Sequence, residues 1–136
     1  MANSVTKNRI SSSVKRQLVE NDATTLSGST YVAIIDAIDV ESYDRASIQV
    51  LSNDEGGGLT CQVWGSLFDS AVALPVTNSK WVQIGDDVVV TASSGSLKSI
   101  ATTALRLLAV TVKATDGSST TVITAGDCKV FLQGTI

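Results

Sequence analysis

The residues best suited to chemistry in this sequence are carboxylates gathered at two predicted turns. Four acidic residues fall between Asp36 and Asp44, and Asp86 is followed directly by Asp87. Either group would bind calcium if its turn arranged the oxygen atoms around one point. However, the spacings match no calcium loop, and aspartates in turns ordinarily accept hydrogen bonds from nearby backbone N–H groups. We therefore predict backbone capping at both places rather than a metal site.

Nucleophilic and zinc chemistry are restricted by composition. The sequence contains no histidine, which removes Ser-His-Asp and Cys-His catalysis and most zinc sites. Cys61 and Cys128 would form a disulfide if their strands were neighbours, but we predict two small buried thiols. No spacing singles out a pair of carboxylates for glycoside hydrolysis. The prediction is therefore a protein that is not an enzyme and has no metal or cofactor.

Two further patterns suggest ligand chemistry only superficially. Gly56 to Gly58 resembles part of a phosphate-binding loop, but the required lysine and hydroxyl residue do not follow and no helix begins there, so we predict a flexible hairpin tip. Trp64, Trp81, Tyr31 and Tyr43 would stack on sugars if they were exposed together. Ring residues in a sandwich are more often core and interface residues, which is the prediction here.

The elements that must position these residues have the alternation of β-strands. Leu59–Asp69 and Trp81–Thr91 place an apolar residue at nearly every second position, which gives a sheet one face to bury. The rings of Trp64 and Trp81 are expected to be what a thin sandwich core packs around. Strands are predicted at 30–40, 45–51, 59–66, 81–84, 88–92, 104–114 (a central strand), 120–124 and 128–134, with a loop or edge segment at 93–103. About eight short strands without a long helix predict an all-β, antiparallel β-sandwich.

Length and charge limit the classes of function. A chain of 136 residues fits one domain, and its 17% of charged residues is below the usual quarter. Such a lightly charged surface favours a subunit of an assembly over a solitary enzyme. The net charge of −3 argues against a nucleic-acid partner. No apolar run is long enough for a signal peptide or a membrane span, so we expect no membrane partner and folding in a reducing cytoplasm.

The first residues differ from the remainder of the chain. Residues 1–20 carry four cations and one acid, a net charge of +3, so residues 21–136 carry −6 of the total of −3. A segment this poor in apolar residues cannot build its own core. We predict an N-terminal arm over residues 1–29, ordered against another surface, and a sandwich domain over residues 30–136; a solvated tail is the alternative. The predicted contact residues are Lys7, Arg9, Lys15 and Arg16 for carboxylates, and Ile10, Val14 and Leu18 for shallow apolar pockets.

The order of motifs along the chain carries a family resemblance. A Tyr-Asp turn at 43–44 leads into Ala-Ser-Ile-Gln-Val, followed by Gln-Val-Trp-Gly-Ser, Trp-Val-Gln-Ile, Leu-Arg-Leu-Leu-Ala-Val-Thr-Val and a last strand that ends in glycine. In this order, residues 30–136 resemble the small β-sandwich structural proteins of tailed bacteriophages, particularly capsid cement or decoration proteins. The segment Gly65–Ser70 departs from the Ser-x-Asp-Gly form expected there, because no glycine follows Asp69.

The resemblance implies a jelly-roll-like sandwich that lies across contacts between major capsid protein subunits. It also implies self-association into dimers or trimers and an arm that reaches to neighbours. We therefore expect a capsid cement protein on the virion exterior, made in the host cytoplasm, which clamps capsomers with residues 1–29. The alternatives are another virion component, such as a tail, neck or head-fibre protein, and a carbohydrate-binding module that exposes Trp64 and Trp81.

Overall fold

The computed structural model describes residues 14–27, 30–52, 58–68, 79–91, 93–115 and 120–135. All regular structure within these ranges is β-strand, which confirms the predicted all-β class. The strands are β1 (Val14–Glu20), β2 (Thr24–Ser27), β3 (Val32–Asp39), β4 (Arg45–Leu51), β5 (Leu59–Ser66), β6 (Val82–Gln83), β7 (Val88–Val90), β8 (Gly95–Ala101), β9 (Leu107–Ala114), β10 (Thr120–Ile123) and β11 (Cys128–Thr135).

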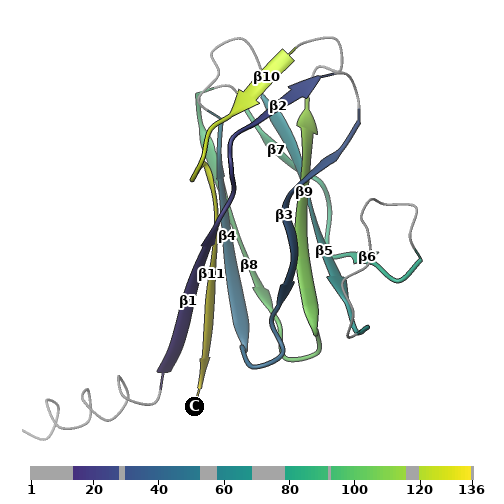
Figure 1. Ribbon diagram of the computed structural model, residues 1–136, viewed down its shortest axis with the longest axis vertical. Coiled ribbons are helices and arrows are strands. Elements are labelled where there is room, and N and C mark those ends of the chain that lie inside the picture. The colour runs from purple at the N-terminus through teal and green to yellow at the C-terminus, as the bar shows by residue number, and fades with distance from the viewer. Residues whose placement is uncertain are drawn as a thin grey trace, which may run out of the picture.

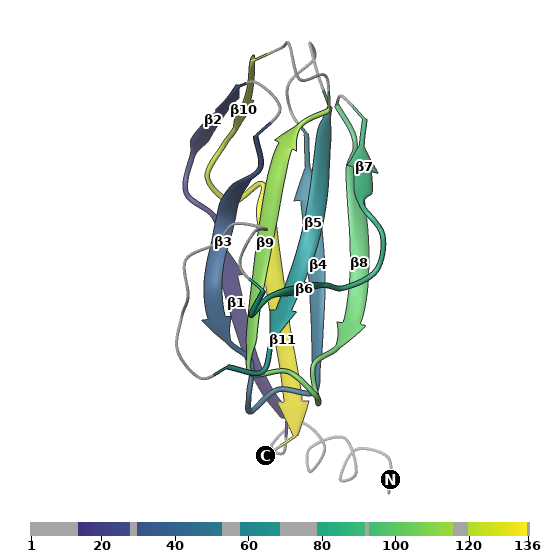
Figure 2. The same ribbon diagram turned by 90° about the vertical axis from the view of Figure 1, so that its right-hand side faces the viewer.

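Two antiparallel sheets lie face to face and form a sandwich (Figure 2). Sheet I has the strand order β1-β11-β4-β8. Sheet II has the order β3-β9-β5, and both β6 and β7 pair with the far side of β5. A separate ribbon of β2 and β10 lies at one end of the sandwich, at the top of Figure 1.

The connectivity is that of a jelly roll, as expected. β2 continues the chain of β1, β10 leads into β11, and β6 and β7 both pair with β5. When each of these three sets of two strands is counted as one position, the eleven strands occupy eight positions along the chain. The first position pairs with the last, the second with the seventh, the third with the sixth and the fourth with the fifth, all antiparallel. This is one long hairpin rolled into two sheets.

The main core lies between the sheets and consists largely of β-branched residues. In β4, the buried residues Ala46, Ile48 and Val50 alternate with outward-facing ones. β9 lies between β3 and β5, which confirms the predicted central strand, and its Leu108 and Val110 are fully buried. Burying one such side chain contributes about 1.5–3 kcal/mol, so this alternation supplies most of the driving force for folding.

The sandwich begins earlier than the predicted boundary at residue 30. β1 pairs with β11 without a break from Val14↔Thr135 to Glu20↔Lys129, and Leu26 is completely buried. The predicted arm over residues 1–29 is therefore wrong for residues 14–27. A strand such as β1 can contain few apolar residues, because only every second side chain faces the core and the neighbouring strand supplies the other core residues. Residues 1–13 lie outside the described part of the chain.

Asn21 forms the corner at which the first strand leaves sheet I. Three residues separate the paired positions Glu20 and Thr24 on one side, opposite five between Ile123 and Lys129, so the register cannot continue. The buried Asn21 amide donates to the carbonyls of Asp22 (2.7 Å) and Thr124 (3.1 Å) and accepts the N–H of Cys128 (2.8 Å). These bonds satisfy backbone groups that the register change leaves unpaired.

Candidate interaction surfaces

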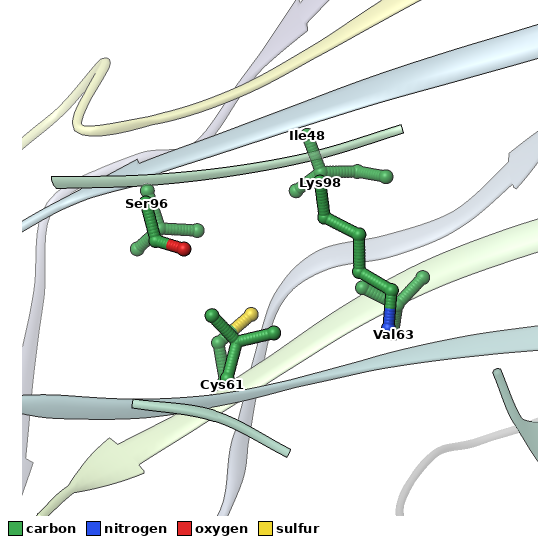
Figure 3. Close-up of a pocket in the computed structure, with 7 residues that line it drawn as sticks. Ile48, Cys61, Val63, Ser96 and Lys98 are labelled. Atoms are coloured by element: carbon green, nitrogen blue, oxygen red, sulfur yellow. The ribbon is translucent and has the colours of Figure 1, made fainter. Parts of the chain in front are cut away.

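A small hollow between the sheets is lined by apolar side chains and three functional groups. Its lining includes the Cys61 thiol, the Ser96 hydroxyl and the Lys98 side chain, which Figure 3 shows extending from its strand towards Val63. The cavity volume is only about 10 Å³, close to the lower limit for one water molecule. The Lys98 Nζ donates to the carbonyl of Ile84 at 2.8 Å. The hollow is therefore a packing defect closed by Lys98, without room for a ligand.

Both cysteines are unreactive residues of the main core. Cys61 is 2% exposed and Cys128 is fully buried, and neither forms a disulfide, which confirms the prediction of two buried thiols. Burial raises the pKa of each thiol to about 12. Since the thiolate is the reactive form, neither side chain is a nucleophile at neutral pH.

The acidic residues of the first predicted turn bind backbone and cationic groups. An Asp36 oxygen accepts the N–H of Ala37 at 2.8 Å, and an Asp39 oxygen accepts the N–H of Glu41 at 2.9 Å. Glu41 also forms an ion pair with Arg106 at 3.2 Å. The contacts of Asp36 and Asp39 are the predicted backbone capping, whereas Asp87 of the second turn accepts hydrogen bonds from side chains instead. Among the residues with described positions, no three Asp, Glu, Cys or His side chains gather at a point that suits a metal ion.

Asp87 is the centre of a polar network on the outer face of sheet II. One carboxylate oxygen accepts from the amides of Gln62 (3.0 Å) and Gln83 (2.7 Å), and the other accepts from the Tyr31 hydroxyl at 3.4 Å. These bonds, led by the one from Gln62, lower the pKa of Asp87, whereas burial and the nearby Asp87 raise the pKa of Tyr31. Lys113 lies over the Tyr31 ring. The network joins Tyr31, just before β3, to β5 and to the β6–β7 segment.

The two tryptophans form a second cluster, on the side of sheet II that faces away from the main core. Trp64 follows the inward-facing Val63 and therefore points outward, where it packs with Trp81, Leu107 and Ala109. Trp64 is only 7% exposed and Trp81 only 4%. The indole N–H of Trp64 donates to the Thr111 hydroxyl at 2.9 Å. The prediction that both rings are core residues is confirmed, although they form a cluster separate from the main core, and the alternative of an exposed sugar-stacking platform is wrong.

An open apolar hollow lies beside the end of β5. Leu67, Phe68 and Val82 are between 50% and 69% exposed, and Leu105 lines the same hollow, whose volume is about 280 Å³. The Lys80 ammonium lies 5.0 Å from the centre of the Phe68 ring. Apolar side chains with a single cation at the rim suit a protein partner better than a small polar ligand.

The outer face of sheet I is a second candidate surface. Leu18 of β1 pairs with Phe131 of β11, and these side chains are 52% and 37% exposed. On the far strand of the same sheet, Leu97 is 69% exposed. The outward-facing cross-strand pairs on either side of Leu18 and Phe131 are polar, and one of them is the 2.6 Å ion pair between Lys129 and Glu20. Sequence reasoning missed Phe131 and Leu97, although their alternation with buried neighbours would have placed them once both strands were assigned.

The predicted contact residues divide between this surface and the part of the chain that is not described. Arg16 and Leu18 are exposed on β1 at the outer face of sheet I. Lys15 is also exposed, but its ammonium donates to the Ser42 hydroxyl at 2.7 Å and lies over the Tyr43 ring. Val14 is the first residue of β1. The other three, Lys7, Arg9 and Ile10, lie outside the described residues.

No protein-family model and no curated protein sequence matches this chain. Among solved structures, a subunit of Bacillus endospore appendages, described as disulfide-linked pili, has a TM-score of 0.52 and 16% identity over 91% of this chain and 89% of its own. A chain of infectious bursal disease virus, Gt strain, has a TM-score of 0.49 and 10% identity, with coverage of 90% and 33%. The Yersinia pseudotuberculosis-derived mitogen has a TM-score of 0.48 and 11% identity, with coverage of 90% and 88%. At these identities, the likeness to the appendage subunit shows the fold alone.

Proposed function

We propose that this protein is a virion structural protein, specifically a capsid cement or decoration protein that binds the outside of a phage head across major capsid protein subunits. The observation that carries the proposal is the outer face of sheet I, where Leu18 and Phe131 are exposed side by side on a rigid sandwich. Apolar side chains that are adjacent on a surface mark contact sites more often than single ones do. The motif resemblance of residues 30–136 supplies the class of partner.

In this proposal, the sheet makes the contact and the first residues extend it. Arg16 and Leu18 lie on the same strand face, so a capsid surface with carboxylates around an apolar hollow would fit both. Lys7, Arg9 and Ile10 precede that strand and would continue the contact towards a neighbouring subunit. Each contact is modest, but a shell presents many copies, and multivalent attachment raises the total affinity.

The experiment is the addition of purified full-length protein to undecorated, expanded heads, followed by sedimentation and a count of bound copies. The protein should co-sediment at a fixed ratio to the major capsid protein. The double variant L18D/F131D should bind at least about tenfold more weakly, because it places charge in an apolar contact. The matched control is V89D, which alters an exposed residue of sheet II. No binding by the wild-type chain would overturn the proposal, and undiminished binding by L18D/F131D would exclude this face.

A truncation experiment separates the first residues from the sheet. Removal of residues 2–13 leaves β1 intact, whereas a longer deletion to residue 20 would remove a strand from sheet I. The shorter deletion should leave a folded sandwich that binds heads more weakly than the full chain. Electron microscopy of decorated particles then separates a head position from a tail, neck or head-fibre position.

A further inference from the structure

The edges of the two sheets are protected to different degrees. A strand edge carries unpaired N–H and C=O groups that invite another strand, unless charges, bulges or short length prevent it. In sheet II, β3 shifts its register with β9 twice between Ala33 and Ile38, and β6 and β7 are only two and three residues long. In sheet I, the edge strand β1 carries Lys15, Arg16 and Glu20. Three of the four edges are therefore poor templates for a new strand.

The fourth edge, β8, lacks these protections. Its seven residues pair with β4 in unbroken register, from Arg45↔Ala101 to Leu51↔Gly95. Its single charged side chain, Lys98, points into the sandwich, where its ammonium donates to the carbonyl of Ile84. The charge is thus already bound within its own subunit and does not project across the edge. β8 is a regular edge without an exposed charge.

The free backbone groups of β8 follow from the hydrogen bonds at its two ends. Ser52 N–H donates to the carbonyl of Ser94 at 2.9 Å, and Thr102 N–H donates to the carbonyl of Asp44 at 2.8 Å. Since hydrogen-bonded residues alternate along an antiparallel pair, the even-numbered residues of β8 bond to β4 and the odd-numbered residues face away. The residues that face away are Gly95, Leu97, Ser99 and Ala101, and all four are exposed. This row of donors and acceptors is a binding site for an extended strand.

We propose that β8 pairs antiparallel with β8 of a second copy, so that the two four-stranded sheets join into one. The inference specifies the self-association that the family resemblance implies, and it rests on the proposed function only for the choice of partner. The exposed Leu97 selects the register. A two-fold axis at Lys98 would place each Leu97 opposite Ser99 of the second copy. An axis at Leu97 instead places Leu97 opposite Leu97 of the second copy, Gly95 opposite Ser99, and Lys98 opposite Ser96.

A second copy is a better occupant of this edge than the other strands of the protein. The register centred on Leu97 buries two leucine side chains that are each 69% exposed in the single subunit. Pairing with β1 of a neighbour would bring Arg16 and Glu20 onto a strand that has no exposed charge to pair with them. The two paired β8 strands would share about six backbone hydrogen bonds, which makes a small protein interface. We therefore expect a weak dimer that the many copies in a shell reinforce.

The register is tested by disulfide trapping in the full chain. Directly opposed residues of a hydrogen-bonded pair lie about 5.5 Å apart at Cα, within the range that a disulfide spans. The native Cys61 and Cys128 are buried and do not interfere. Under mild oxidation, L97C should give a covalent dimer, whereas S99C on the same strand and L18C on the opposite edge should remain monomeric. A monomeric L97C overturns the proposal, as does faster trapping of S99C or trapping only when L97C and L18C are mixed.

The strength of the β8–β8 self-association is tested by sedimentation equilibrium. L97K places two like charges at the axis and should weaken self-association about tenfold. V89K places the same charge at an exposed apolar residue of sheet II and should leave self-association unchanged. Equal effects of the two variants would overturn the proposal. The head-binding experiment can fail independently of the trapping experiment. If L97C forms a covalent dimer but the protein does not bind heads, the cement function is overturned and the pairing of β8 stands. If the protein binds heads but L97C stays monomeric, the pairing of β8 is overturned and the cement function stands.

Discussion

The outer faces of the two sheets have the same alternating sequence pattern but opposite environments. On sheet II, Trp64 is 7% exposed and Thr111 is fully buried, and every residue of β5 is buried on both faces. On sheet I, Leu18 and Phe131 are 52% and 37% exposed in the corresponding outward positions. Alternation therefore identifies the residues that share a face, but not whether that face is covered. The uncovered face is the one available for a partner.

The largest test of this comparison is the truncation of one aromatic ring on each outer face. W64A should lower the free energy of unfolding by about 3–5 kcal/mol, because the ring is buried and its removal leaves a cavity. F131A should lower it by about 1 kcal/mol or less, because that ring is partly solvated. Urea denaturation of both variants measures the difference. Equal losses would show that the two faces are covered alike.

Removal of one hydroxyl group on each outer face should have a smaller effect on the free energy of unfolding. The Thr111 hydroxyl accepts the buried indole N–H of Trp64 at 2.9 Å. T111V keeps the shape but leaves this donor unpaired, at a cost of about 1–3 kcal/mol. The exposed Ser47 and Ser99 hydroxyls are 3.4 Å apart, and S47A should change stability by no more than about 0.5 kcal/mol. Thermal unfolding of both variants measures these effects, and a larger loss for S47A would contradict the comparison.

A pH-dependent effect is expected at the polar network of sheet II. Hydrogen bonds from Gln62 and Gln83 lower the pKa of Asp87 in the folded protein below its usual 3.8. The carboxylate therefore stabilises the fold above that value, and the contribution is lost as the pH falls through the lowered pKa. Because Asp87 is exposed, D87N should cost less than about 1 kcal/mol at pH 7. Denaturation of D87N between pH 2 and 7 should converge with the wild type at the acid end; D86N is the matched control, and a constant difference would contradict this prediction.

The smallest effect is expected at the ion pair on the open face of sheet I. Lys129 and Glu20 lie 2.6 Å apart, but their side chains are 43% and 45% exposed. Solvent screening limits such a pair to between about 0.2 and 1 kcal/mol. A double-mutant cycle with K129M and E20Q should therefore give a coupling energy in the lower half of this range, which decreases further in high salt. A coupling above about 1.5 kcal/mol would mean that this face is less solvated than the exposures of its side chains indicate.

The strands with strict alternation were predictable from the sequence. The bounds of β4 and β5 agree with prediction, because each has turn-forming residues on both sides and apolar residues on a regular face. β8 was predicted only as a loop or edge segment, since an edge strand can be built from small polar residues such as Ser96 and Ser99. β1 was assigned to an arm because its partner, β11, lies more than a hundred residues away, beyond the reach of any local pattern. The exposed pair Leu18 and Phe131 depends on that same pairing.

The rolled hairpin also has a consequence for synthesis on the ribosome. The last strand, β11, inserts between β1 and β4, and both the start of β1 and the end of β11 lie at the same pole of the molecule (Figure 1). Until Thr135 has left the exit tunnel, β1 has no neighbour in sheet I and β4 has an open side. The nascent chain must therefore wait for β11 before the sheet can close, and such long-range pairing is slow and prone to aggregation.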